Sequence, residues 1–166
     1  PVNIEKASVD GWELVVQHNF GETGFGMIAN ATIVNADVGY DNLLCEQPVC
    51  NLSTQFVITG LSNSANLVAY YEKNAIGVRL AYNWRDDFLA GTGQDNVGAG
   101  PPTYVAAYGQ VDLNASYKFL SDKLTAFVDI LNLTNETTYV YGRSKDQPLF
   151  ATQLGTRYNV GFRYKF

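Results

Sequence analysis

Few side chains in this sequence could carry out acid–base, nucleophilic or metal chemistry. There is one histidine, His18, and there are two cysteines, Cys45 and Cys50. A Ser-His-Asp arrangement needs a histidine beside its nucleophile, but His18 falls on the apolar side of an alternating segment, where an interfacial histidine is the simpler interpretation. Without a second cysteine pair or a histidine pair, a zinc ion has no ligand set. We therefore expect no enzymatic activity, no metal site and no cofactor.

The two cysteines lie five residues apart in a polar segment rich in turn-forming residues. The spacing favours a local disulfide between Cys45 and Cys50 over two free thiols, and a disulfide indicates an oxidising compartment such as the periplasm or the cell surface. The nearby acidic residues Asp37, Asp41 and Glu46 have no EF-hand pattern around them, so solvated loop charge explains them better than calcium binding.

The composition excludes nucleic acid as a partner and limits how the chain could cross a membrane. Only 16% of the residues are charged, against about a quarter in a typical soluble domain. The net charge is -5 and no cluster of Lys and Arg occurs, so the electrostatic footprint of nucleic-acid binding is missing. No apolar run approaches the roughly 18 residues of a transmembrane helix. If the chain crosses a membrane, it must therefore do so with β-strands.

Alternation of apolar and polar residues is the dominant pattern. It is clearest at the end of the chain, where Tyr158, Val160 and Phe162 alternate with Asn159 and Gly161. This period of two predicts β-strands. Seven strands are predicted, each long enough to cross a bilayer at a tilt: 11–20, 24–35, 64–72, 75–85, 109–119, 123–132 and 156–166. The alternation is looser in 123–132 and weaker in 24–35 and 64–72.

The connections between these segments alternate in length. Short turns are predicted at 21–23, 72–74 and 121–122, and long loops at about 36–63, 86–107 and 133–155. All long loops then lie on one rim of an up-and-down sheet, which is typical of outer-membrane barrels. Seven strands place Phe166 on the short-turn rim and Pro1 on the other. They also leave two open edges that lipid does not tolerate, so we expect further strands upstream of Pro1.

The polar face of the predicted strands is expected to line a lumen, because an Arg or Lys facing lipid costs roughly 2–4 kcal/mol near the midplane. Aromatic residues gather toward the strand ends, as they do at membrane interfaces. A small soluble barrel with its apolar face inside would show no such bias. We expect the charges of the polar face to pair with one another: Glu13, Arg79, Arg85, Asp112, Lys118, Asp129, Arg157 and Arg163.

Five segments in order and spacing resemble the C-terminal region of TonB-dependent outer-membrane receptors: Asn66–Lys73, Val78–Arg85, Tyr108–Leu113, Asp129–Asn135 and Gly161–Phe166. The resemblance implies a transmembrane antiparallel barrel of about 22 strands with an N-terminal plug inside it. Residues 1–166 would be its last seven strands. The plug, the earlier strands and the part that contacts the TonB complex would lie upstream. Phe166 resembles the family's terminal aromatic signal for the barrel-assembly machinery.

The expected function is energised uptake of a scarce nutrient, either a carbohydrate or other large organic nutrient or a ferric siderophore. The barrel would contact outer-membrane lipid, with its C-terminus periplasmic and its long loops extracellular. Four tyrosines could offer stacking surfaces to a ligand, or could belong to an aromatic girdle or a loop core: Tyr104, Tyr108, Tyr139 and Tyr141. The polar face could also contact the plug. A passive porin or structural barrel is the alternative, and a soluble ligand-binding barrel is a third.

Overall fold

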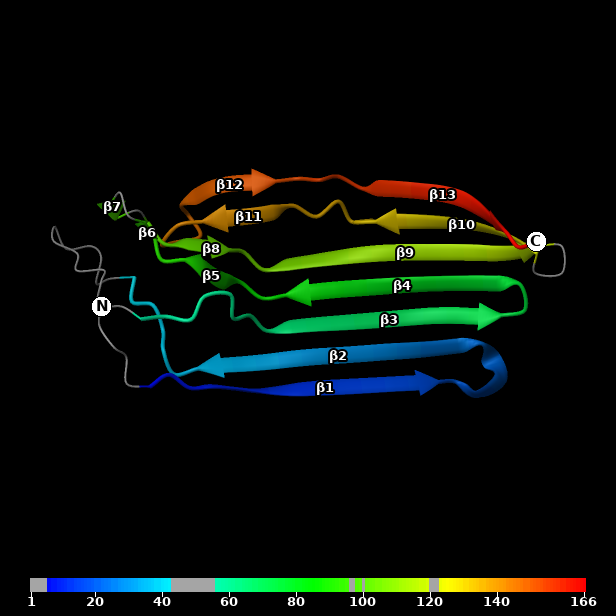
Figure 1. Ribbon diagram of the computed structural model, residues 1–166, viewed down its shortest axis with the longest axis horizontal. Helices are drawn as coiled ribbons and strands as arrows, with labels where there is room; N and C mark the ends of the chain where they lie inside the picture. The colour runs from blue at the N-terminus through cyan, green and yellow to red at the C-terminus, as the bar shows by residue number, and fades with distance from the viewer. Residues whose placement is uncertain (1–5, 43–55, 96–97, 100, 120–122) are drawn as a thin grey trace.

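The computed structural model describes residues 6–42, 56–95, 98–99, 101–119 and 123–166. Its main feature is a seven-stranded antiparallel sheet in the order β1-β2-β3-β4-β9-β10-β13, drawn in Figure 1. The strands are β1 (Val9–Asn19), β2 (Phe25–Ala36), β3 (Ser64–Lys73), β4 (Ile76–Arg85), β9 (Tyr108–Phe119), β10 (Leu124–Leu131) and β13 (Arg157–Tyr164). All seven predicted strands are present, and the all-β fold is confirmed.

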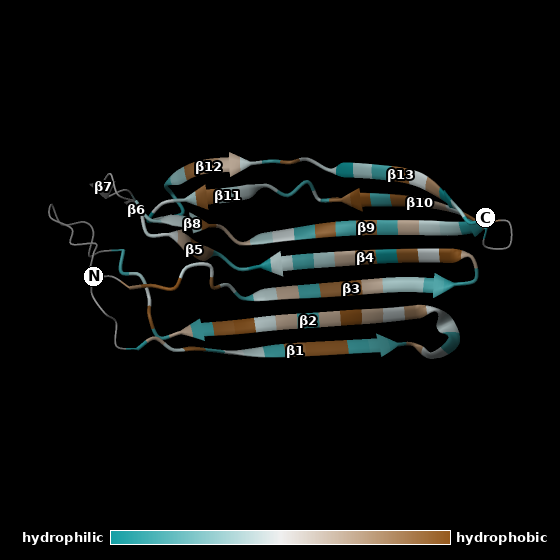
Figure 2. Ribbon diagram, in the orientation of Figure 1, coloured by the Kyte–Doolittle hydropathy of each residue, from teal (hydrophilic) through white to brown (hydrophobic). Residues whose placement is uncertain are grey.

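The register between neighbouring strands keeps apolar residues opposite apolar residues. Leu80 lies opposite Leu113, and Val128 lies opposite Val160. Because successive residues of a strand point to opposite faces, the sheet has one apolar and one polar face. Figure 2 shows the resulting bands of hydrophobic and hydrophilic residues along the strands. His18 lies on the apolar face opposite Met27, as predicted.

The apolar face is exposed rather than packed against a second layer. Trp12, Val160 and Phe162 are each more than 70% exposed. Among the described residues, the buried apolar side chains are Val68, Pro102, Val140 and Tyr141. An apolar surface of this extent needs a non-aqueous neighbour. In the described part of the chain, no helix is long and apolar enough to span a membrane.

The two ends of the sheet differ, as the loop lengths predicted. One end, here called the turn rim, carries the 3-10 turn η1 (Gly21–Thr23) and the tight turn at Asn74, whose φ is 55°. The end of the chain lies at the same rim (Figure 1). The long connections all lie at the opposite end, here called the loop rim. The predicted turn at 121–122 lies outside the described residues.

Two of the predicted long loops contain strands of their own. A four-stranded sheet, here called the loop sheet, has the order β12-β11-β8-β5 and lies beyond the loop-rim ends of β4, β9 and β10 (Figure 1). Its strands are β5 (Phe88–Gly91), β8 (Thr103–Val105), β11 (Thr138–Tyr141) and β12 (Pro148–Thr152). A two-residue ladder joins β6 (Gln94–Asp95) to β7 (Gly98–Ala99). Strands this short give no readable alternation in the sequence, so the sequence predicts only long loops for these segments.

Candidate functional site

The eight charged residues predicted to line a lumen all lie on the polar face of the seven-stranded sheet, here called the polar wall. The register carries this face from strand to strand: Glu13 lies opposite Thr32, Thr32 opposite Ser64, and Ser64 opposite Arg85. Asp112 on β9 lies on the same face of the sheet. The full set on the wall is Glu13, Arg79, Arg85, Asp112, Lys118, Asp129, Arg157 and Arg163.

The expected ion pairs among these charges do not form. In the described part of the chain, the one ion pair joins Lys145 to Asp87 at 2.9 Å, and it lies in the loop sheet. The register gives the reason. Asp129 lies opposite Asn114 on β9 and opposite Asn159 on β13, so the groups nearest to its carboxylate are amides rather than cations.

Side-chain amides donate hydrogen bonds to the carboxylates of the polar wall. Asn114 Nδ2 donates a hydrogen bond to Asp129 Oδ1, and Asn159 Nδ2 donates to Asp129 Oδ2 at 3.1 Å. Asn83 Nδ2 donates to Asp112 Oδ2 at 3.4 Å. Hydrogen bonds to an ionised carboxylate are among the stronger ones in proteins, so both acids are stabilised without using a cation. The amide ladder, as we name this set, comprises Asn30, Asn66, Asn83, Asp112, Asn114, Asp129 and Asn159.

Asp112 connects the wall to the base of the third long loop. Its Oδ1 accepts the backbone N–H of Asn132 at 2.9 Å and Gln110 Nε2 at 2.6 Å. Asn132 is only 4% exposed and has a φ of 57°. Its side chain accepts the Glu136 N–H at 2.8 Å and donates to the Glu136 carbonyl at 3.1 Å, and its own carbonyl accepts the Thr156 hydroxyl at 2.9 Å. In the sequence, Asn132 is marked only as part of the family-like segment Asp129–Asn135, with no role of its own.

Two arginines of the wall contact aromatic rings. The guanidinium of Arg85 lies 5.0 Å from the ring centroid of Phe88 and 5.8 Å from that of Tyr108. Arg163 lies 5.8 Å from the ring of Phe127. Such contacts stabilise a cation by about 0.5–1 kcal/mol at exposed sites. Aromatic faces thus take the place of the expected carboxylate partners at these two positions.

The four tyrosines predicted as ligand contacts have different surroundings. Tyr104 and Tyr141 stack on each other, with ring centroids 5.3 Å apart and planes 9° apart. Tyr141 is buried and donates its hydroxyl to Asp87 at 2.8 Å. Tyr108 donates to Gln110 at 2.8 Å. Tyr139 is 53% exposed. The four tyrosines therefore do not surround a common binding site.

The carboxylate of Asp87 accepts polar contacts from both Lys145 and Tyr141 beside the loop sheet. The hydrogen bond from Lys145 is the largest influence on its carboxyl and lowers its pKa below the ordinary 3.8, and the hydroxyl of Tyr141 acts in the same direction. Burial is the main cause that raises the pKa of Tyr141, followed by its bond to Asp87. The Tyr141 hydroxyl therefore stays protonated and remains a donor across the physiological range.

All three long loops meet at one asparagine. Tyr104, from the second loop, donates its hydroxyl to Asn42 Oδ1 of the first loop at 3.3 Å. Asn42 Nδ2 donates to the carbonyl of Arg143 in the third loop at 3.4 Å. A second contact joins Tyr40 to the carbonyl of Thr92 at 3.4 Å. No pattern in the sequence indicated these contacts, because they join segments far apart in the chain.

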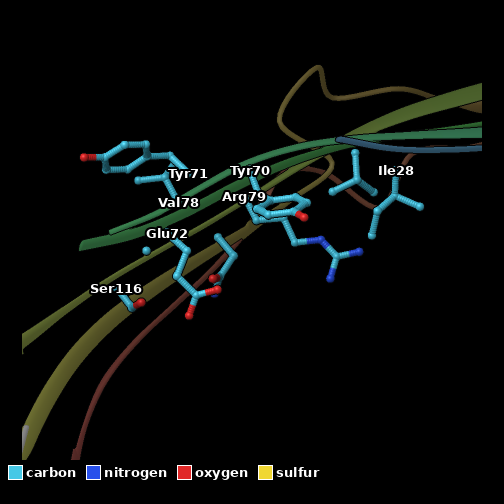
Figure 3. Close-up of a pocket in the computed structure, with 10 residues that line it drawn as sticks. Ile28, Tyr70, Tyr71, Glu72, Val78, Arg79 and Ser116 are labelled. Carbon is cyan, nitrogen blue, oxygen red and sulfur yellow. The ribbon is translucent and has the colours of Figure 1, made fainter. Parts of the chain in front are cut away.

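The polar wall is hollowed in two neighbouring places. One hollow, of about 370 Å³, lies over β2, β3, β4 and β9 and is shown in Figure 3. In that view Arg79, Glu72 and Ser116 project from one side of the strands, and Tyr71 lies on the other side. The second hollow, of about 390 Å³, lies over β3, β4, β9, β10 and β13. Arg79 and Asn114 line both.

Two further sites were predicted, the terminal Phe166 and the cysteine pair. Phe166 is fully exposed at the turn rim and makes an edge-on ring contact with Tyr164, at 5.3 Å between centroids. Its predicted role as an assembly signal stays a prediction. Cys45 and Cys50, predicted to form a disulfide, lie outside the described residues.

Comparison with known proteins agrees with this geometry. The family model described as TonB dependent receptor-like, beta-barrel, matches residues 1–133, which is most of the chain and includes the first six strands of the seven-stranded sheet. Searches of curated proteins and of solved structures gave no match. Receptors of this family are transporters of the outer membrane that act with a plug domain and with TonB. The chain therefore belongs to the TonB-dependent receptor family and is a C-terminal region of its β-barrel.

Proposed function

We propose that this chain is part of a receptor that takes up a scarce nutrient by transport energised from the inner membrane through TonB. The nutrient is a carbohydrate or other large organic molecule, or a ferric siderophore. Membership of the family supports the general mode of transport. The loop rim faces the cell exterior and captures the nutrient, and the turn rim with Phe166 faces the periplasm. The plug lies against the polar wall.

The observation that carries this proposal is the one-sided construction of the molecule. At the loop rim, the second and third loops form the loop sheet, and Asn42 joins the first loop to both of them. At the turn rim the described connections are tight turns. Long loops on one rim are shared by porins and receptors, but here they form a connected surface at which a receptor would first bind its nutrient. Family membership favours the receptor over a passive pore.

Tyr139 is the best candidate for a ligand contact among the four predicted tyrosines. Its ring is half exposed, and the residue opposite it on the neighbouring strand β12 is the small Ala151. An exposed aromatic ring suits sugars and aromatic chelators. Tyr141, Tyr104 and Tyr108 support the loops and the upper wall through the contacts described above.

Uptake by the complete receptor, measured with and without a working TonB complex, tests the proposal. Cells that express the receptor are given oligosaccharides and ferric siderophores as labelled nutrients, and accumulation is followed over time. We expect uptake of one class to stop when TonB is deleted. Uptake that continues at the same rate without TonB would instead identify a passive porin.

A further inference from the structure

The second hollow of the polar wall, here called the amide hollow, has a chemistry that selects among ligands. It is about 390 Å³ in volume, and Asn83, Asn114, Asp129 and Asn159 line it together with Arg79. Ala81 and Leu131 add apolar surface. The inference drawn from it rests on the proposed function, because it concerns the nutrient that such a receptor would carry.

Several polar groups in the amide hollow have unused hydrogen-bonding capacity. Asn114 and Asn159 each use one N–H on Asp129, which leaves each amide a second N–H and a carbonyl oxygen. Within the described residues, no group accepts a hydrogen bond from the guanidinium of Arg79 or pairs with it as an ion. Both amides and Arg79 are exposed. The hollow therefore offers donors and acceptors side by side.

This mixture of donors and acceptors suits hydroxyl groups. A hydroxyl donates one hydrogen bond and accepts others, so it can use an amide oxygen and a guanidinium N–H at the same time. The carbon skeleton of a sugar can contact the apolar surface of Ala81 and Leu131. A purely anionic group can use only the donors and would leave the amide oxygens unpaired, which costs binding free energy.

The charge distribution disfavours anionic ligands. Asp112 and Asp129 line the amide hollow and outnumber Arg79. In the sequence, the segments of the long loops, 37–63, 86–107 and 132–156, carry eight acidic and only two basic residues. They thus hold a larger net negative charge than the -5 of the whole chain. A negative field at the loop rim slows the approach of anions and lowers their local concentration.

We infer that the amide hollow binds the hydroxyl groups of an uncharged, polyhydroxylated nutrient, an oligosaccharide, on its way between the polar wall and the plug. Of the two nutrient classes in the proposed function, this selects the carbohydrate and disfavours an anionic ferric chelate. Asn114 and Asn159 are the principal contacts, and Arg79 donates from the centre of the wall.

Equilibrium binding to the purified complete receptor tests the inference. The probes are four neutral oligosaccharides, maltohexaose, cellohexaose, xylohexaose and hexa-N-acetylchitohexaose, and the anionic chelate ferric citrate, measured by calorimetry. We expect at least one oligosaccharide to bind and ferric citrate not to. Asn114→Leu and Asn159→Leu should each weaken oligosaccharide binding about tenfold, the effect of losing one net hydrogen bond.

Asn30→Leu is the matched control, since Asn30 belongs to the amide ladder but does not line the amide hollow. Its affinity should stay within about twofold of the unmodified receptor. Asn114→Gln restores an amide and should recover part of the binding, which a merely structural role would not require. Each variant is first checked for normal barrel assembly by its mobility on gels without heating.

Three outcomes would overturn the inference: ferric citrate binds and the oligosaccharides do not, none of the probes binds, or an oligosaccharide binds with equal affinity to Asn114→Leu, Asn159→Leu and the unmodified receptor. The measurement needs no energy source, so it is independent of the test of energised uptake. TonB-dependent import of ferric citrate would support the proposed function and contradict the inference. Oligosaccharide binding followed by TonB-independent flux would support the inference and contradict the proposed function.

Discussion

Asn132 holds together the base of the third long loop through its conformation and its hydrogen bonds. It is the only buried polar residue in the described part of the chain. With a φ of 57°, it adopts the left-handed region that asparagine tolerates better than other residues with a β-carbon. Its backbone N–H reaches the carboxylate of Asp112 on the wall. This residue thus links the loop rim to the amide ladder.

Substitution of Asn132 should separate backbone strain from hydrogen bonding. Asn132→Ala loses the side-chain bonds to Glu136 and also places an unsuitable residue at positive φ, and should destabilise the receptor by about 2–4 kcal/mol. Asn132→Gly loses the same bonds without strain and should cost about 1 kcal/mol less than the alanine variant. Urea unfolding of the complete receptor measures both. Equal losses would show that the conformation contributes nothing.

The Asp87 carboxylate predicts how the loop sheet responds to pH. Its pKa is lowered in the folded protein, so its contribution to stability is present above the ordinary value of 3.8 and is lost as the pH falls through the folded pKa. The bonds from Lys145 and Tyr141 should therefore weaken only below about pH 4. The pKa values of Lys145 and Tyr141 are raised, so their contributions are fully present below about pH 10 and are lost as the pH rises through the raised pKa values.

Hydrogen exchange of residues 138–141 as a function of pH measures this response. Asp87→Asn keeps an acceptor for Tyr141 and removes the ion pair with Lys145. The variant should show faster exchange at neutral pH and little further change on acidification. A variant as well protected as the unmodified receptor at pH 7 would contradict an electrostatic role for Asp87.

At the scale of the element, apolar and polar residues alternate along each strand of the seven-stranded sheet. Each strand therefore contributes to both the apolar face and the polar wall. On β10, Val128 belongs to the apolar face opposite Val160, and its neighbour Asp129 belongs to the polar wall opposite Asn159. A slip of one residue would exchange the two faces of the strand. The continuous apolar face therefore excludes registers shifted by one residue, because such a slip would place wall charges on the apolar face.

Val128→Arg and Asp129→Arg form a matched pair that tests the assignment of faces. An arginine that faces lipid in mid-strand costs roughly 2–4 kcal/mol, so Val128→Arg should block or slow assembly into the outer membrane. Asp129→Arg faces the polar wall and should assemble. Heat-modifiable mobility of the receptor in membrane fractions measures assembly. Normal assembly of Val128→Arg would reverse the assignment and favour a soluble barrel with an apolar interior.

At the scale of the whole molecule, the two rims differ in both structure and charge. The loop rim carries the loop sheet, and the long-loop segments hold eight of the 16 acidic residues, whereas the turn rim carries short turns and the end of the chain. In the seven-stranded sheet, β1 and β13 are the two edges. Edges cannot remain unpaired in lipid, so in the proposed receptor this sheet would be one section of a larger barrel wall.

Cysteine labelling from outside intact cells tests the proposed orientation. In a receptor with Cys45 and Cys50 replaced by serine, Tyr139→Cys at the loop rim should react with a membrane-impermeant maleimide. Lys123→Cys, at the turn rim, should react only after the outer membrane is made permeable. The opposite result would invert the orientation. With the native cysteines present, labelling that requires a reductant would reveal the predicted disulfide.

The sequence by itself determined the seven strands, their two faces and the alternation of short and long connections, because a strand's period of two and the length of a loop are local properties of the chain. Only the tertiary structure decided which side chains meet. The cross-strand neighbours of Asp129 are asparagines from β9 and β13. Tyr141 donates a hydrogen bond to Asp87, which is 54 residues away in the sequence. Such neighbours depend on register and on pairing between distant segments, and neither leaves a pattern in the sequence. The amide ladder and the loop sheet could therefore not be predicted, whereas the wall that carries them could.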